Sequence, residues 1–326
     1  MKCTSKKIIT SILLLFVLVL AGCGKEKYSY QFSRSMDSNA YTILTTGGID
    51  GKLESFSEDI CVDVASDHMP GINMAGAKSS GLFDLHNEKV LYANNIYEEL
   101  PPASITKIMT ALCAIKYGNL DSMITVSGNC KITESGAQKI GIEQGDTLTL
   151  EQALNILLLY SANDVAVAIA ENVAGSEAEF VNMMNAEAKK LGATHTNFCN
   201  PHGLNAENHY TTVYDLYLIM NEVTKYDTFN EIVSKVNYST TIGLASGERR
   251  DINIDTTNQY LKGNQTSPES ITVLGGKTGT TAAAGNCLII YSQDNAGNKY
   301  ISVVLGDDSK DNLYVDMNTL LEAAGK

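Results

Sequence analysis

The sequence has little positive charge, no closely spaced cysteine pair and no apolar run of transmembrane length. Lysine and arginine together number 24, against 37 aspartate and glutamate residues, which gives a formal net charge of −13. A chain with this charge repels phosphate backbones, which argues against a nucleic-acid-binding protein. The seven cysteines include no C-x-x-C pair, so the sequence shows no disulfide framework.

The first 22 residues are typical of an export signal. Basic residues at positions 2, 6 and 7 precede an apolar run from Ile8 to Leu20, which is too short for a transmembrane helix and suits a secretory signal. The run ends in Leu20-Ala21-Gly22-Cys23, which resembles a bacterial lipobox. This resemblance implies cleavage before Cys23 and attachment of lipid to its sulfur, and hence an exported protein anchored to the outer face of the cytoplasmic membrane. A plain signal peptide beside an incidental cysteine is the alternative.

Residues 23–75 are predicted to form a tether and an irregular lead-in, because they lack helical periodicity and contain many Ser, Asp, Gly and Tyr residues. An ordered domain is expected over residues 76–326. Beyond Cys23 the number of cysteines is odd, and most of them are expected to be small buried hydrophobic residues. These cysteines are Cys61, Cys113, Cys130, Cys199 and Cys287.

The region 76–326 is predicted to have strands at both ends and helices between them. Apolar runs at 81–85 and 89–93 predict one hairpin, and those at 287–291 and 300–305 predict a second. Helices are predicted at 104–117 and 163–173, and after the capping residues Thr149, Ser176, Thr212 and Ser309. This order predicts an α+β fold, in which helices cover an antiparallel sheet and a subdomain is mostly helical.

Ser104 and Lys107 form the first of three short elements that carry chemistry. At positions i and i+3 they share one face of the predicted helix. The free N–H groups at a helix start favour a developing oxyanion, and a partly buried lysine near another cation can accept the proton of a serine hydroxyl. An N-cap serine beside a solvated lysine is the better explanation of the pair when it is considered alone.

The second element is Ser161-Ala162-Asn163, in the predicted turn after an apolar helix. Its hydroxyl could pass a proton to a leaving amine, and its amide could hold Lys107 and a substrate carbonyl. A simple turn between helices is the alternative reading. Ser127-Gly128-Asn129 has the same pattern, but it follows Lys107 too closely and in a β-rich stretch, so we rank it below Ser161.

The third element is Lys277-Thr278-Gly279, on a predicted strand. A lysine and a hydroxyl side by side can bind a carboxylate. Gly279 would leave room for a peptide-like ligand along the strand edge. The backbone N–H of Thr280 could join that of Ser104 in an oxyanion hole. A turn at the edge of a strand is the alternative for this element.

The three elements together are specific in their order and in their predicted placement. They resemble the penicillin-binding protein and serine β-lactamase superfamily, and more closely its low-molecular-mass D-Ala-D-Ala carboxypeptidases. The resemblance covers about residues 76 to 326. It extends to the strings KVLYAN at 89–94, LPPASITKIMTAL at 100–112, FCNPHGLNAENHYTTVYD at 198–215 and LGGKTGT at 274–280.

The resemblance implies a transpeptidase-like fold and acyl transfer through Ser104, with Lys107 as its base. Ser161 and Asn163 would serve proton transfer and substrate positioning. The expected substrate is a peptidoglycan stem peptide that ends in D-Ala-D-Ala, and β-lactams are expected to acylate the same serine. No metal and no cofactor are expected.

Three other functions are considered. His195, Cys199, His202 and His209 cluster in the sequence, but their spacing is no standard zinc pattern and no H-E-x-x-H string occurs. A non-enzymatic penicillin-binding sensor would not need the pair Ser104 and Lys107. A β-lactamase or a peptidoglycan endopeptidase could share the scaffold. No E-x-x-L-N string lies between Asn163 and Lys277, which argues against rapid β-lactam hydrolysis.

Overall fold

The computed structural model describes residues 60–326. These residues form one compact unit. The predicted export signal, Cys23 and most of the predicted tether are therefore outside the described residues. Among residues 60–326, no helix combines the length and the apolar character that crossing a bilayer requires.

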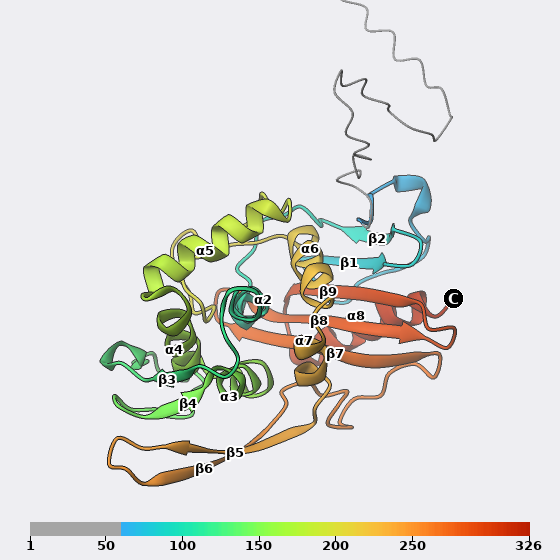
Figure 1. Ribbon diagram of the computed structural model, residues 1–326. Coiled ribbons are helices and arrows are strands. Elements are labelled where there is room, and N and C mark those ends of the chain that lie inside the picture. Colours follow the sequence, from blue (N-terminus) through green and yellow to red (C-terminus); the bar gives the residue numbers. More distant parts are fainter. Residues whose placement is uncertain (1–59) are drawn as a thin grey trace, which may run out of the picture. The chain divides into compact units, whose positions relative to one another are not determined.

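A five-stranded antiparallel sheet forms the centre of the described domain (Figure 1). Its strand order is β2-β1-β9-β8-β7, and both hairpins predicted from the sequence are present in it. Strand β7 is at one edge, so part of its backbone N–H and C=O groups face away from the sheet. The strands are β1 (Ser79–Asp84), β2 (Lys89–Asn94), β7 (Ile271–Thr281), β8 (Gly285–Asp294) and β9 (Lys299–Asp307).

The two faces of this sheet pack against two separate apolar cores. Leu82 and Leu288 pack with the C-terminal helix α8 (Lys310–Ala324). Their chain neighbours Phe83 and Ile289 pack with the block of helices on the other side. Successive side chains of a strand point to opposite faces, so this alternation places the sheet between α8 and the helical block. The α+β fold expected from the sequence is confirmed.

The helical block contains six α-helices among the described residues. Three of them, α3, α5 and α6, begin directly after predicted caps, and α7 was not predicted from the sequence. Thr149 and Gln152 exchange the two hydrogen bonds of a capping box. Ser176, Thr212 and Ser309 each accept a backbone N–H three residues further on. The helices are α2 (Lys107–Tyr117), α3 (Leu150–Asn155), α4 (Asn163–Ala174), α5 (Glu177–Lys190), α6 (Val213–Val223) and α7 (Asp227–Val233).

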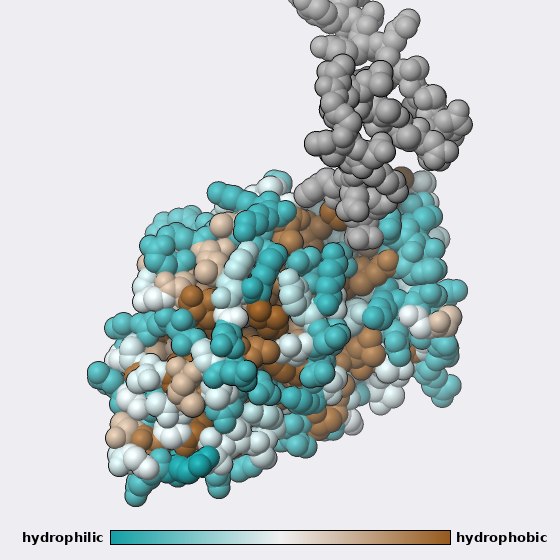
Figure 2. Space-filling view, in the orientation of Figure 1, coloured by the Kyte–Doolittle hydropathy of each residue, from teal (hydrophilic) through white to brown (hydrophobic). Residues whose placement is uncertain are grey.

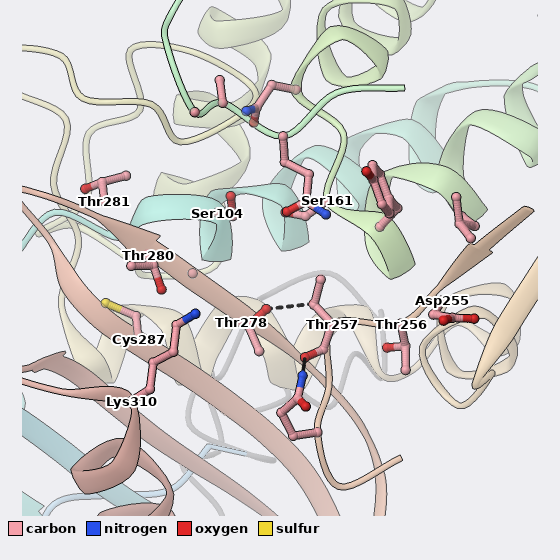
Figure 3. Close-up of a pocket in the computed structure, with 18 of the residues that line it drawn as sticks. Ser104, Ser161, Asp255, Thr256, Thr257, Thr278, Thr280, Thr281, Cys287 and Lys310 are labelled. Carbon is pink, nitrogen blue, oxygen red and sulfur yellow. Dashed lines mark hydrogen bonds between the residues drawn. The ribbon is translucent and has the colours of Figure 1, made fainter. Parts of the chain in front are cut away.

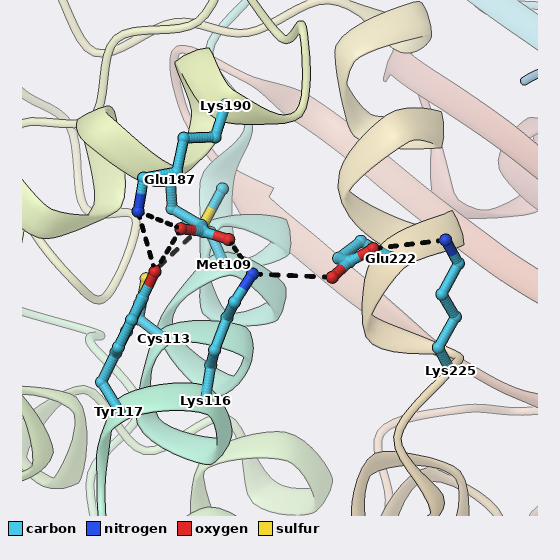
Figure 4. A network of polar contacts seen from close by, with 8 residues as sticks. All are labelled: Met109, Cys113, Lys116, Tyr117, Glu187, Lys190, Glu222 and Lys225. Atoms are coloured by element: carbon cyan, nitrogen blue, oxygen red, sulfur yellow. Dashed lines mark hydrogen bonds and ion pairs between the residues drawn. The ribbon is translucent and has the colours of Figure 1, made fainter. Parts of the chain in front are cut away.

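A buried carboxylate, Glu187 of α5, holds α2 in this block (Figure 4). It accepts hydrogen bonds from Lys116 and Tyr117 at the end of α2, and from Lys190 at 3.1 Å. Burial would raise the pKa of Glu187, but these hydrogen bonds outweigh it and lower that pKa. Lys116 also lies 3.7 Å from Glu222 of α6, so α2 is tied to two neighbouring helices.

The domain has a second sheet of four strands, and the sequence did not predict all of it. Its order is β3-β4-β5-β6, and β5 and β6 form a polar ribbon in which Ser239 bonds to Asn253 and Thr241 to Asp251. The ribbon has few apolar residues, although Ile252 and Ile254 alternate with polar residues in β6. The face of the domain seen in Figure 2 mixes teal, pale and brown residues. The strands are β3 (Met123–Thr125), β4 (Thr147–Thr149), β5 (Asn237–Gly243) and β6 (Arg249–Asp255).

The chain already packs on the domain before residue 76, the position at which the sequence predicted the ordered domain to begin. The N–H of Cys61 donates to the Tyr217 hydroxyl at 2.7 Å, and Cys61 itself is buried. The N–H groups of residues 75, 76 and 77 all donate to the carboxylate of Asp316 in α8. The last part of the predicted lead-in therefore packs on the domain, and it contains a short 3₁₀ turn, Ala65–Asp67. All five cysteines among the described residues are free thiols, and four are buried.

Candidate active site

A cleft of about 1350 Å³ lies between strand β7 and the helical block (Figure 3). Its lining includes Ser104, Ser161, Asn163 and Thr278, which the sequence predicted as site residues. Gly279 and Thr280 line it as well, while Lys107 and Lys277 are buried beside it and bond to residues of its wall. Folding therefore brings the three predicted elements to one place.

Ser104 lies in a 3₁₀ turn, Ala103–Thr106, that continues directly into α2. The predicted α-helix from residue 104 thus begins only at Lys107. Ala103 has a left-handed backbone with φ of 48°, a conformation that costs a non-glycine residue about 1–2 kcal/mol. N–H groups at a helix start lack acceptors in the helix itself, so the turn presents such groups to the cleft.

The side chain of Lys107 is fully buried and has three partners. Its Nζ lies 3.0 Å from Ser104 Oγ and 2.6 Å from Asn163 Oδ1. The third partner is the backbone carbonyl of His202. Burial lowers the pKa of Lys107 well below its ordinary value, and the charge of Lys277 lowers it further. The site thus favours a neutral amine next to the serine hydroxyl.

Ser161 and Asn163 are placed by a local widening of the preceding helix. Helix α3 continues as a π-helical turn, Ile156–Tyr160, and ends at Ser161, whose φ of 70° is left-handed. π-Helical turns are rare and often occur at functional sites. Asn163 starts α4, and its N–H donates to the carbonyl of Gln138. The turn directs both polar side chains toward the buried lysines.

Strand β7 supplies Lys277 and Thr278 from the opposite wall. Lys277 Nζ lies 3.0 Å from Ser161 Oγ, and burial lowers the pKa of Lys277 to about 7. The Thr278 hydroxyl lies 2.7 Å from the hydroxyl of Thr257 (Figure 3). Thr257 was not identified from the sequence, because it belongs to an irregular segment after β6 that carries no motif.

Gly279 lies in a close contact that the sequence did not predict. We expected its missing side chain to make room for a ligand along the strand, and it does line the cleft. A Cβ at this position would also lie 3.0 Å from the Ala103 Cβ and 3.0 Å from the Ser104 nitrogen. A side chain here would therefore press on the serine turn, against which β7 passes directly. This close approach also brings the next residue, Thr280, near the Ser104 N–H.

The segment 196–211 forms the far wall of the lysine pocket. Asn200 braces it from within, since its Oδ1 accepts the N–H groups of His202 and Gly203 and its Nδ2 donates to the Leu204 carbonyl. The Pro201 carbonyl accepts the Thr110 hydroxyl of α2. The segment therefore fixes the carbonyl that receives Lys107. The NPHGL string pointed to this segment, but not to the role of a backbone oxygen.

The two buried histidines of this segment use their ring nitrogens within the protein. His202 Nδ1 accepts the N–H of Leu204, and His209 Nδ1 accepts the N–H of Cys199 at 3.1 Å. Burial lowers the pKa of His209 to about 4, and burial with the charge of Lys107 lowers that of His202 to about 3. Among residues 60–326, no group of three His, Cys, Asp or Glu side chains is arranged to hold a metal ion.

The lower-ranked serine, Ser127, does not line the cleft around Ser104. Its hydroxyl donates to Glu171, and the amide of Asn129 donates to the same carboxylate. These bonds hold a short turn against α4. The side chains of Ser127 and Asn129 therefore have a structural role.

The family comparison covers most of the described domain. The family described as D-alanyl-D-alanine carboxypeptidase (Peptidase_S11) matches residues 65–309. The chain belongs to this family. The D-alanyl-D-alanine carboxypeptidase DacF of Bacillus subtilis is 33% identical over 251 residues, which cover 76% of this chain and 62% of the relative. DacC of Escherichia coli is 33% identical over 235 residues, 69% of this chain and 55% of the relative. The chain therefore spans less than two thirds of the length of either D-alanyl-D-alanine carboxypeptidase.

A solved structure supports the same fold. The Streptomyces K15 DD-transpeptidase superposes with a TM-score of 0.71, covering 78% of this chain and 98% of that one at 24% identity. The transpeptidase-like architecture predicted from the sequence is thus confirmed for this member of the D-alanyl-D-alanine carboxypeptidase family.

Proposed function

We propose that the chain is a serine-type D-Ala-D-Ala carboxypeptidase that removes the terminal D-Ala from peptidoglycan stem peptides. The observation that carries this proposal is the set of partners around Lys107. A neutral amine has two N–H groups and one lone pair. Asn163 Oδ1 and the His202 carbonyl can each accept one N–H, which leaves the lone pair for Ser104 Oγ at 3.0 Å. Lys107 is therefore suited to take the serine proton.

The first step is attack of Ser104 Oγ on the carbonyl carbon of the penultimate D-Ala, while the hydroxyl proton passes to Lys107. The carbonyl oxygen becomes an oxyanion, and the N–H groups of Ser104 and Thr280 are the donors available beside it. Strand β7 lies close to the serine turn, since a Cβ on Gly279 would lie 3.0 Å from the Ser104 nitrogen. This closeness supports the N–H groups of Ser104 and Thr280 as the two donors to the oxyanion.

The leaving D-Ala needs a binding group and a proton. Lys277 and the Thr278 hydroxyl would bind its carboxylate. Lys277 Nζ donates to Ser161 Oγ at 3.0 Å, so the Ser161 hydroxyl keeps its own proton for the leaving amine. The C–N bond then breaks as the leaving amine takes the Ser161 proton, and the proton that Lys107 took from Ser104 passes to Ser161. D-Ala departs, and an ester on Ser104 remains. Water attacks this ester while Lys107 takes one of its protons, the bond to Ser104 Oγ breaks, that proton returns to Oγ, and the shortened peptide is released. A β-lactam would form the same ester and hydrolyse slowly.

Release of free D-Ala from a pentapeptide ending in D-Ala-D-Ala tests this function. The parent is expected to release D-Ala and to gain the mass of one β-lactam on Ser104, whereas Ser104→Ala should do neither. Survival of D-Ala release in Ser104→Ala would overturn the mechanism. Faster turnover of nitrocefin than of the pentapeptide would favour a β-lactamase, and cleavage of cross-linked dimers would favour an endopeptidase. Retained activity after dialysis against a chelator would exclude the zinc alternative.

We also propose that the protein is lipid-anchored at Cys23 on the outer face of the cytoplasmic membrane. The basic start, the short apolar run and the small residues before Cys23 support this location. When the full chain is expressed in an exporting bacterium, the parent should partition into the detergent phase and Cys23→Ala into the aqueous phase. Equal partitioning of the two would contradict lipidation.

A further inference from the structure

A chain of hydrogen bonds ends at the carbonyl of Ala103, the residue before the nucleophile, whose backbone is left-handed. The Thr106 hydroxyl donates to the Ala103 carbonyl at 2.8 Å. The same Thr106 oxygen lies 3.0 Å from His209 Nε2. The chain therefore runs from a histidine of the distant loop to the peptide unit that joins Ala103 to Ser104.

The direction of these bonds follows from the ring of His209. Its Nδ1 accepts the N–H of Cys199, so in the neutral ring the proton sits on Nε2. That proton can only be donated to Thr106, whose own proton goes to the Ala103 carbonyl. Each donor in the chain is thus assigned, and consecutive bonds of this kind strengthen one another.

The position of His209 is itself fixed. Two residues further on, Thr211 exchanges two backbone hydrogen bonds with Leu100, just before the turn that carries Ser104. The imidazole is 5% exposed and meets the buried Phe198 ring edge-on, with 5.8 Å between centroids. The ring cannot swing away from Thr106 without breaking these contacts.

We infer that His209 is a positioning residue for the nucleophile: through Thr106 it holds the Ala103 peptide in the conformation that keeps Ser104 Oγ in reach of Lys107. This inference rests on the proposed acyl transfer at Ser104. His209 touches neither the substrate nor the reacting atoms. Its loss should therefore slow acylation while leaving the binding of the terminal carboxylate, on β7, intact.

Two substitutions separate the two bonds of the ring. His209→Gln can place an amide N–H where Nε2 stands and so keep the bond to Thr106. His209→Asn can place its carbonyl where Nδ1 stands and so keep only the bond from Cys199. Each variant loses one hydrogen bond inside the same loop, so their melting temperatures should fall alike. Only the Asn variant loses the link to the serine turn.

The measurement is the rate at which a fluorescent penicillin labels Ser104, with KM for the pentapeptide measured beside it. A small displacement of a reacting group can cost about 100-fold in rate, and we expect a loss of that order for His209→Asn with KM unchanged. His209→Gln should stay within about threefold of the parent, because the bond to Thr106 is kept. Equal loss in both variants would overturn the inference in favour of a general loop role.

Thr106 supplies the second arm of the test. Thr106→Val removes the hydroxyl, and Thr106→Ser keeps it. In the Thr106→Val background, His209→Asn should cause no further loss of labelling rate, because both act through one chain of bonds. Additive losses would contradict the inference while the parent still labels at Ser104. A parent that is not labelled at Ser104 at all would overturn the proposed function, and with it this inference.

Discussion

The positive charge of Lys277 lowers the pKa of Lys107, and after burial it is the next largest cause of that lowered pKa. The two residues come from the start of α2 and from β7, and both are buried. Each has one active-site serine as a partner, Ser104 for the first and Ser161 for the second. The strand lysine therefore affects the base electrostatically in addition to any contact with substrate.

Replacement of Lys277 should move the pH dependence of acylation. The rate at which a β-lactam acylates Ser104 is expected to rise with pH, as Lys107 loses its proton. Lys277→Met removes the neighbouring positive charge, which raises the pKa of Lys107 and shifts the acid limb to higher pH. Lys277→Arg keeps the charge and should leave the limb near its parental position. Identical limbs in the Met and Arg variants would refute the coupling.

Asn163→Asp should inactivate the enzyme at neutral pH in a way that alkali reverses. Asn163 Oδ1 accepts from Lys107 at 2.6 Å, and aspartate has nearly the same shape. A carboxylate there raises the pKa of Lys107, so the base stays protonated and acylation at pH 7 falls. Raising the pH should restore the rate. Asn163→Ala is the control, since it loses the bond without adding charge and should not recover in alkali.

The parts of the site that the sequence predicted are those carried by short strings. Ser104 and Lys107 stand three residues apart, and Lys277 and Thr278 are adjacent, so residue type and spacing identified them once the order of the three elements and the resemblance were added. The N-cap residues and the hairpins were equally local. The string at 198–215 included His209, but not its contact with Thr106, 103 positions away. Thr257 meets Thr278 at 21 positions' separation, and no local pattern marks such contacts.

Two elements were missed for a different physical reason. The β5–β6 ribbon buries few apolar side chains, so the alternation that identifies a strand is weak in Asn237–Gly243. The π-helical turn Ile156–Tyr160 continues the same apolar pattern as α3. Periodicity indicated a helix here correctly, but could not distinguish its type.

Thr257 should govern the affinity of the cleft for its substrate. Its hydroxyl lies 2.7 Å from that of Thr278, and its N–H donates to the Leu159 carbonyl in the π-helical turn. Thr257→Val keeps the shape and removes the partner that orients Thr278. One hydrogen bond corresponds to a rise in KM of roughly 2- to 10-fold, with kcat little changed. Thr257→Ser should retain the parental KM, and a fall in kcat alone for Thr257→Val would contradict this role.

Gly203→Ala should damage both stability and acylation, and Gly247→Ala is its matched control. The two glycines have nearly the same left-handed φ, 86° and 88°. At Gly247 a Cβ would meet nothing within 4 Å, so alanine there should cost only the backbone conformation, about 1–2 kcal/mol of unfolding free energy. At Gly203 the Cβ would lie 1.9 Å from the Ala103 carbonyl oxygen, so overpacking adds about 1–3 kcal/mol. The clash also pushes on the peptide before Ser104. Chemical denaturation and the rate of penicillin labelling measure the two effects, and equal behaviour of the two variants would show that the contact between Gly203 and Ala103 is unimportant.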